Sequence, residues 1–280
     1  MSASSQEIKL QKVAGDCANA QSDRVAVEEP LEIRLGFATP DGRTAKSISI
    51  TMRTPGHDEE LALGFLYTEG IITGLADVSE VAHCGPPAPD TGNHNIIRVD
   101  LADGVAVDIG KLQRNFYTTS SCGVCGKSSL DALRVTGAAP IAAGGFKIPV
   151  EVLTTMPDKL RDMQATFDQT GGLHAAAAFD SQGEIIVTRE DVGRHNAVDK
   201  VAGALYSDSR LPASDMGLLV SGRASFELMQ KALMCGMPLL AAVSAPSSLA
   251  VRLAEEFDVT LVGFLRGDTF NIYSGGERVS

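Results

Sequence analysis

Two cysteines three positions apart are the residues of this chain best suited to covalent chemistry. Cys122 and Cys125 lie in a stretch of small and hydroxylated residues (118–129), directly before a helical pattern. The positive end of that helix and the ammonium of Lys127 both favour a thiolate over a thiol. A thiolate in such a loop is a nucleophile or a metal ligand. As a nucleophile it can take sulfur from a persulfide donor, and the second thiol can then release or receive that sulfur.

Metal binding is the alternative for this cysteine pair. Structural zinc needs four ligands, and beyond His83 and Cys84 the sequence offers no second pair at suitable spacing, so we expect no structural metal. A zinc deaminase carries H-x-E followed by P-C-x-x-C, and His57 and Glu59 supply the first half. Ser121 replaces the proline, however, and about 60 residues separate the halves. A zinc deaminase therefore stays as an alternative enzyme class.

A second group of functional side chains lies within residues 189–200. Arg194, His195 and Asn196 are predicted on the first turn of a helix, where they would meet a ligand. The competing interpretation is a helix capped by Asp191 with an apolar face toward the core. We favour the ligand interpretation here. His174, which follows a Thr-Gly-Gly turn, is harder to assign, because a lone histidine is more often a satisfied core residue than a ligand contact.

Three loops in the last third of the chain predict an anion site. Apolar runs at 216–220, 239–243 and 261–265 alternate with helical patterns at 225–235 and 247–257, which indicates parallel strands. Ligands of such sheets bind beyond the carboxyl ends of the strands, where helix N-termini suit phosphate. The residues at these ends are Ser221, Gly222, Arg223, Ser244, Phe264, Leu265, Arg266, Gly267, Asp268 and Thr269. Ordinary helix caps and turns are the alternative for any single loop.

The remaining patterns outline an α+β first half. Alternating residues at 25–37 and 48–52 flank Asp41-Gly42 and predict a hairpin, and a helix follows residue 54. A second alternating pair covers 95–101 and 104–109. Beyond a Gly- and Pro-bearing stretch we expect a helix from about Pro157, then a hairpin of 174–179 with 184–188. We divide the chain into a flexible tail (1–23), an α+β subdomain with the cysteine loop (24–140) and an α/β nucleotide-binding subdomain (141–280).

Composition narrows the class of protein. The chain has 280 residues, 44% hydrophobic and 21% charged, with a net charge of −11, so it should be globular and should bind neither nucleic acid nor anionic membranes. No apolar run reaches the length that spans a bilayer, and the first 21 residues have no signal-peptide core. We therefore expect a cytoplasmic protein with reduced thiols.

Several blocks, in order from about residue 25 onward, match one known family. They are Arg53-Thr54-Pro55-Gly56, residues 59–66, Glu69-Gly70, Ser121-Cys122-Gly123-Val124-Cys125-Gly126, residues 170–176, Glu190-Asp191-Val192-Gly193-Arg194-His195-Asn196-Ala197-Val198-Asp199-Lys200, Ser221-Gly222-Arg223, Ser244-Ala245-Pro246 and residues 263–267. The run from Glu190 to Lys200 is the most specific of these. The chain resembles the formate dehydrogenase accessory sulfurtransferases, the FdhD-type sulfur carrier proteins.

The resemblance implies a function, a fold and partners. Members take persulfide sulfur from a cysteine desulfurase onto the loop cysteines, here Cys122 with Cys125 as its partner. They pass it to the molybdenum cofactor that carries two molybdopterin guanine dinucleotides, before the cofactor enters the formate dehydrogenase apoenzyme. The fold is similar to the layered α/β fold of cytidine deaminases, with a mixed sheet. Members form homodimers and bind guanine nucleotides such as GDP as mimics of the cofactor, with residues 264–269 implicated. A chaperone that holds the cofactor without chemistry is the alternative from a binding class.

Overall fold

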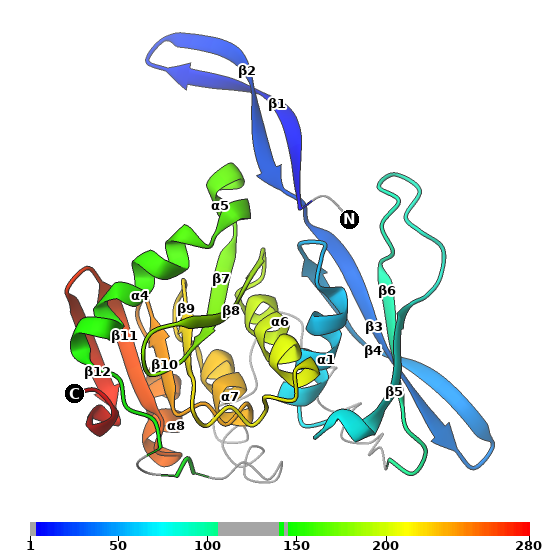
Figure 1. Ribbon diagram of the computed structural model, residues 1–280. Helices are drawn as coiled ribbons and strands as arrows, with labels where there is room; N and C mark the ends of the chain where they lie inside the picture. The colour runs from blue at the N-terminus through cyan, green and yellow to red at the C-terminus, as the bar shows by residue number, and fades with distance from the viewer. Residues whose placement is uncertain (1–3, 106–139, 143–144) are drawn as a thin grey trace.

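A six-stranded mixed sheet forms the centre of the C-terminal half. The computed structural model describes residues 4–105, 140–142 and 145–280 (Figure 1). In sheet order the strands are β12 (Thr269–Ser274), β11 (Thr260–Arg266), β10 (Leu239–Ala242), β9 (Gly217–Val220), β7 (His174–Phe179) and β8 (Ile185–Asp191). β9, β10 and β11 are parallel and the other neighbours antiparallel. The predicted α/β class with a mixed sheet is confirmed, as is the hairpin of β7 with β8.

Helices cover both faces of this sheet because its apolar residues alternate between them. Residues such as Leu218 and Leu240 pack in the core with α6 (Arg194–Ser207), α7 (Phe226–Met234) and α8 (Ser248–Glu256). Their neighbours Leu219 and Leu239 pack in a second core against α4 (Val150–Asp162). A strand buried on both faces lacks a polar side, which is why these strands appear in the sequence as continuous apolar runs.

The helix expected from about Pro157 begins earlier than predicted. α4 starts at Val150 with Pro157 in its interior, and a separate short helix α5 (Ala165–Thr170) carries Phe167. Proline inside a helix removes one backbone hydrogen bond and normally ends the helix. Here Leu153, Met156 and Leu160 are fully buried against the sheet, and this packing outweighs the local cost of the proline.

The N-terminal half contains a second sheet, in agreement with the predicted α+β organisation. Its strands, in sheet order, are β4 (Gly42–Arg53), β3 (Glu29–Thr39), β6 (Ile96–Leu101) and β5 (Val78–His83). β3 and β4 form the predicted hairpin around Asp41-Gly42. β6 pairs with β3 in parallel and with β5 in antiparallel fashion. The expected partner of β6 at 104–109 lies mostly outside the described residues.

Two glycines bring the halves into direct backbone contact. α1 (Asp58–Thr68) lies against α6, as Figure 1 shows. A Cβ atom added to Gly64 would lie 1.8 Å from the Asp199 carbonyl oxygen, and one added to Gly203 would lie 1.8 Å from that of Glu60. Only glycine permits so close an approach. The core of the first sheet is therefore continuous with that of the second. The expected boundary near residue 140 stays a prediction.

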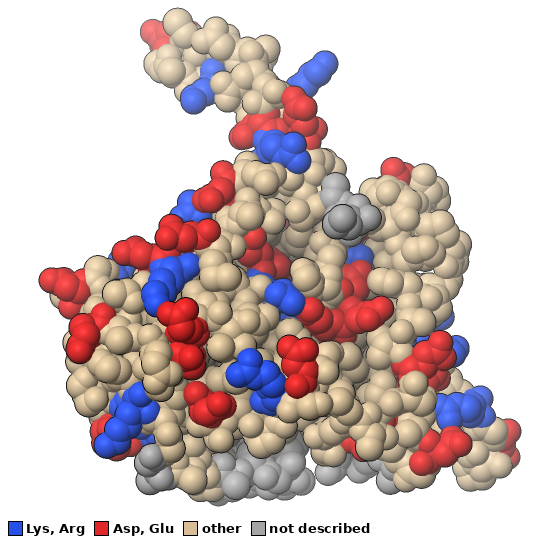
Figure 2. Space-filling view, in the orientation of Figure 1, with Lys and Arg blue, Asp and Glu red and all other residues tan. Residues whose placement is uncertain are grey.

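Strands replace the structureless tail expected at residues 1–23. β1 (Ser5–Ala14) and β2 (Cys17–Ala26) form an antiparallel hairpin that projects from the body of the protein (Figures 1 and 2). The missed signal is Gly15-Asp16, a two-residue turn between the strands with Gly15 at φ +60°. At the base of the hairpin the Ser5 hydroxyl donates to Gln169 Oε1 at 3.2 Å.

Two surface properties bear on the expected partners. None of the helices within the described residues is long and apolar enough to cross a membrane. On the face shown in Figure 2, lysine and arginine side chains are scattered among aspartate and glutamate rather than gathered into one patch.

Candidate functional site

The ends of the three parallel strands lie side by side. The Ser244 amide donates to the Gly222 carbonyl at 3.3 Å, and the Phe264 amide donates to the Ser244 carbonyl at 3.2 Å. Arg266 Nε donates to the Val243 carbonyl at 3.0 Å, so its guanidinium lies over the neighbouring strand. The structure thus brings the loops after β9, β10 and β11 together, as parallel topology requires.

Two of the predicted residues in the last loop differ sharply in accessibility. Leu265 is fully buried in the second core, so its side chain is not available to a ligand. Phe264 is 40% exposed and has φ +55°, an unusual conformation for an aromatic residue. Such strained residues gather at functional sites. Gly267 and Asp268 form the turn from β11 to β12, which begins at Thr269.

The first turn of α6 completes this surface. β7 runs antiparallel to β9, so its first residue, His174, lies at the same end of the sheet as the β9 loop, and it pairs with Asp191. Arg194 and His195 follow immediately on α6. His195 Nε2 lies 3.9 Å from Glu227 Oε2 on the first turn of α7. We call the following set the strand-end surface: His174, Arg194, His195, Ser221–Arg223, Ser244, Phe264 and Arg266–Thr269.

The histidines of the strand-end surface are neutral at pH 7. Burial lowers the pKa of His195 to about 4, and the cations Lys231 and Arg194 act in the same direction. Burial and Arg194 also lower the pKa of His174, against the opposing effect of Asp191. The positive charge of the surface therefore comes from its arginines.

Two buried polar atoms of this surface lack partners. Among the described residues, Arg194 Nε and His195 Nε2 have no hydrogen-bond partner. A buried N–H without an acceptor costs free energy comparable to a lost hydrogen bond. Both atoms belong to residues predicted to meet a ligand: a bound anion would supply an acceptor to Arg194 Nε, and to His195 Nε2 once that nitrogen carries a proton.

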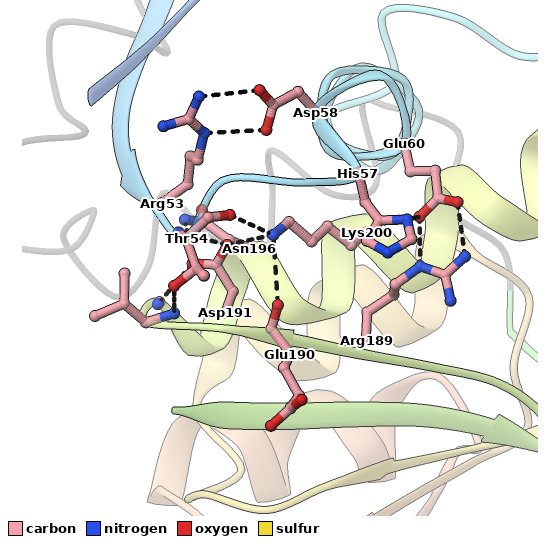
Figure 3. Close-up of polar contacts among 12 residues, drawn as sticks. Arg53, Thr54, His57, Asp58, Glu60, Arg189, Glu190, Asp191, Asn196 and Lys200 are labelled. Atoms are coloured by element: carbon pink, nitrogen blue, oxygen red, sulfur yellow. Dashed lines mark hydrogen bonds and ion pairs between the residues drawn. The ribbon is translucent and has the colours of Figure 1, made fainter. Parts of the chain in front are cut away.

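Other residues of the 189–200 run hold the fold together instead of facing a ligand. Lys200 and Asp191, both almost fully buried, form an ion pair at 2.7 Å, and Lys200 Nζ also donates to the Thr54 carbonyl at 2.9 Å (Figure 3). Asn196 Nδ2 donates to Asp191 Oδ1 at 2.9 Å and to the Met52 carbonyl at 2.7 Å. This network ties the end of β4 to α6. For Asn196 the ligand interpretation is wrong: its amide is occupied within the chain.

The helix cap also differs from the predicted one. Gly193 is the N-cap of α6, and Asp191 lies two residues before it. The Asp191 carboxylate accepts from the Gly193 amide at 2.8 Å and from the Thr54 amide at 3.2 Å. Asp191 therefore orients the turn into the helix rather than capping the helix itself.

Charged pairs around α1 form a second network that the sequence analysis missed. Arg53 and Asp58 make two hydrogen bonds of 3.0 Å each (Figure 3). Arg189 makes a similar two-pronged contact with Glu60, which His57 Nδ1 also approaches at 3.2 Å. Although burial alone would raise it, these contacts lower the pKa of Glu60 to about 2. The available signal was the density of charge in residues 53–60, directly after a predicted strand.

A cavity of about 270 Å³ lies beside these pairs. Its walls include Thr54, His57, Thr166, Arg189, Glu190 and Lys200. Arg189 and Lys200 are held by Glu60 and Asp191, and both Glu190 oxygens accept from the backbone amides of Thr166 and Phe167. Arg189, Lys200 and Glu190 are therefore paired within the chain and are not available to a ligand in this cavity.

The predicted reactive cysteines, Cys122 and Cys125, lie outside the described residues. Of the described cysteines, Cys17 is exposed, Cys84 is half-buried and Cys235 is buried. The described part of the chain contains no group of three His, Cys, Asp or Glu side chains that could hold a metal. His57 is engaged with Glu60, as above. The zinc alternatives depend on Cys122 and Cys125 and stay predictions.

Comparisons with known proteins agree with these sequence blocks. Residues 26–280 match the FdhD/NarQ family. The chain is 50% identical to the sulfur carrier protein FdhD of Streptomyces coelicolor over 274 residues, 97% of this chain and 94% of the relative. It is 53% identical to the sulfur carrier protein FdhD of Mycolicibacterium paratuberculosis, covering 94% of both. A crystal structure from Desulfotalea psychrophila, described as a formate dehydrogenase accessory protein, superposes with a TM-score of 0.74 at 25% identity over 99% of both chains. The chain belongs to the FdhD/NarQ family.

Proposed function

We propose that this protein is a sulfur carrier that serves formate dehydrogenase. It takes persulfide sulfur from a cysteine desulfurase and passes it to the molybdenum cofactor with two molybdopterin guanine dinucleotides, before insertion into the apoenzyme. The observation that carries the proposal is the near-full-length identity of about half with proteins named sulfur carriers. We further propose that it acts in the cytoplasm as a homodimer.

The cysteine pair supplies the covalent chemistry. The Cys122 thiolate attacks the outer sulfur of the donor persulfide, a new S–S bond forms, and the donor leaves as a thiolate. This step exchanges one disulfide-type bond for another and needs no oxidant. Attack of Cys125 on Cys122 then releases hydrosulfide and leaves a Cys122–Cys125 disulfide, which a cellular thiol reduces. Lys127 and the helix predicted to follow it favour the thiolates on which both steps depend.

The strand-end surface supplies the binding site for the acceptor. Arg194, Arg223 and Arg266 lie around it, and arginine pairs well with phosphate oxygens through parallel N–H donors. Arg194 Nε, which has no hydrogen-bond partner among the described residues, supports this assignment. The guanine dinucleotide parts of the cofactor bring phosphates to this surface, and GDP serves as their mimic.

The sulfur-carrying step is tested by labelling. The protein is incubated with a cysteine desulfurase and cysteine, digested without reductant, and analysed by mass spectrometry. We expect added sulfur on the peptide that contains Cys122 and its loss in Cys122→Ala. Cys17, Cys84 and Cys235 serve as controls within the same chain. Sulfur found only on these three would contradict the proposal.

A cofactor-binding chaperone without chemistry is the second candidate. One observation favours it: the arginines of the strand-end surface, with Arg194 Nε lacking a hydrogen-bond partner, would bind the phosphates of the cofactor without any covalent step. The Cys122→Ala, Cys125→Ala double variant separates the two functions. A pure chaperone would still support an active formate dehydrogenase with this variant, whereas a sulfur carrier would not.

A further inference from the structure

Three features of His195 and its neighbour Arg194 occur together at the N-terminal end of α6. Its Nε2 is buried without a hydrogen-bond partner among the described residues, while its side chain is 38% exposed overall. The Nε atom of the adjacent Arg194 is also buried and has no hydrogen-bond partner among the described residues. The ring therefore lies at the rim of the strand-end surface, partly open to a ligand and short of a polar contact.

The groups that face His195 come from three elements. Arg194 lies on its own helix, Glu227 and Lys231 lie on α7, and His174 lies at the start of β7. Lys231 forms an ion pair with Asp199 at 2.8 Å, so its charge is not available to a ligand at the surface. Burial is the largest effect on His195 and lowers its pKa to about 4; Lys231 and Arg194 act in the same direction, against the carboxylate of Glu227. The imidazole is therefore neutral while the site is empty.

A bound anion reverses this balance. We propose, building on the nucleotide binding proposed above, that His195 is the proton-accepting group of the strand-end surface: when the phosphates of a guanine nucleotide bind beside Arg194, the imidazole takes up a proton and becomes a further cationic contact. The proton comes from the solvent, one N–H bond forms, and no other bond changes. The empty site thereby avoids a second cation beside Arg194, and the occupied site gains one.

The size of the effect follows from proton linkage. If the ligand returns the pKa of His195 from about 4 to its ordinary value of 6.5, affinity rises about tenfold between pH 8 and pH 5.5. Near pH 6 each ligand bound takes up about 0.7 proton. The sign is fixed because the group is protonated more readily in the complex than in the free protein.

The experiment is calorimetry with GDP-mannose in buffers of different ionisation enthalpy. The terminal phosphate of GDP itself titrates near pH 6, whereas the pyrophosphate diester of GDP-mannose keeps its charge across this range. We expect proton uptake and tighter binding at low pH in the natural protein. Both should disappear in His195→Asn and persist in the control His94→Asn, an exposed histidine before β6 that lies outside the strand-end surface. Histidine proton NMR of the natural protein, assigned with His195→Asn, should show that the pKa of His195 rises when the nucleotide binds.

The possible failures are distinguishable. Binding of GDP at pH 8, with GDP-mannose affinity that does not change with pH, would overturn the role of His195 and leave the nucleotide site standing. Proton uptake that persists in His195→Asn but is lost in His174→Asn would show that His174 takes up the proton, and this result would overturn the inference. If neither GDP nor GDP-mannose binds at any pH, the nucleotide site itself is refuted, and the inference with it.

Discussion

Replacing Lys200 with methionine should destabilise this protein more than any surface substitution of lysine. Methionine keeps most of the apolar stem but removes the ammonium, which lies 2.7 Å from Asp191 and 2.9 Å from the Thr54 carbonyl. The exposed fractions of the two side chains are 1% and 0%. Removing one partner of a buried ion pair costs about 3–5 kcal/mol, because the other charge is left without compensation.

Urea unfolding followed by circular dichroism measures this loss. The matched control is Lys159→Met: that lysine is 41% exposed and lies 3.7 Å from Glu184, so its removal should cost less than about 1 kcal/mol. In the Asp191→Asn, Lys200→Met double variant neither charge of this pair remains, and the loss should be smaller than the sum of the two single losses. If Lys200→Met were no more destabilising than Lys159→Met, the network would not stabilise the contact between β4 and α6.

Three further predictions follow from other contacts. Gly203→Ala places a Cβ atom 1.8 Å from the Glu60 carbonyl oxygen and should lower the free energy of unfolding by about 3 kcal/mol or more, whereas Gly74→Ala, which meets nothing within 4 Å, should change it by less than about 1 kcal/mol. Arg223→Ala and Arg266→Ala should each weaken calorimetric binding of GDP by about 1–3 kcal/mol, and unchanged affinity in both would remove the nucleotide from this surface. The Glu60 carboxylate, with a pKa lowered to about 2, contributes stability that is present above its ordinary value of 4.5 and lost as pH falls toward about 2; urea midpoints of Glu60→Gln should therefore fall less steeply over that window.

Local patterns were sufficient for most of the C-terminal half. The strands around Leu218, Leu240 and Leu261 appear as short apolar runs separated by amphipathic helices, and parallel topology then places their carboxyl ends at one edge. This is why the sequence alone groups the loops that carry Arg223 and Arg266.

Long-range packing explains where the local patterns failed. The local pattern predicts a helix that begins at about Pro157, yet α4 begins at Val150 and continues through the proline, because Leu153 and Leu160 are buried on either side. Arg189 was not assigned a role, because its carboxylate partner Glu60 lies 129 positions away in the sequence and only tertiary contact brings the two together.

The sequence by itself determined the family, through ordered motifs, and the chemistry available at the cysteine pair and the strand ends. Only the tertiary structure separated the roles within the run from Asp191 to Lys200. Asp191 is buried beside β4, where it forms an ion pair with Lys200 and accepts a hydrogen bond from Asn196. Arg194 and His195 lie at the strand-end surface instead, and each has a polar atom without a hydrogen-bond partner among the described residues. Side-chain type is written in the sequence, but desolvation and the choice of partner arise only when distant segments meet.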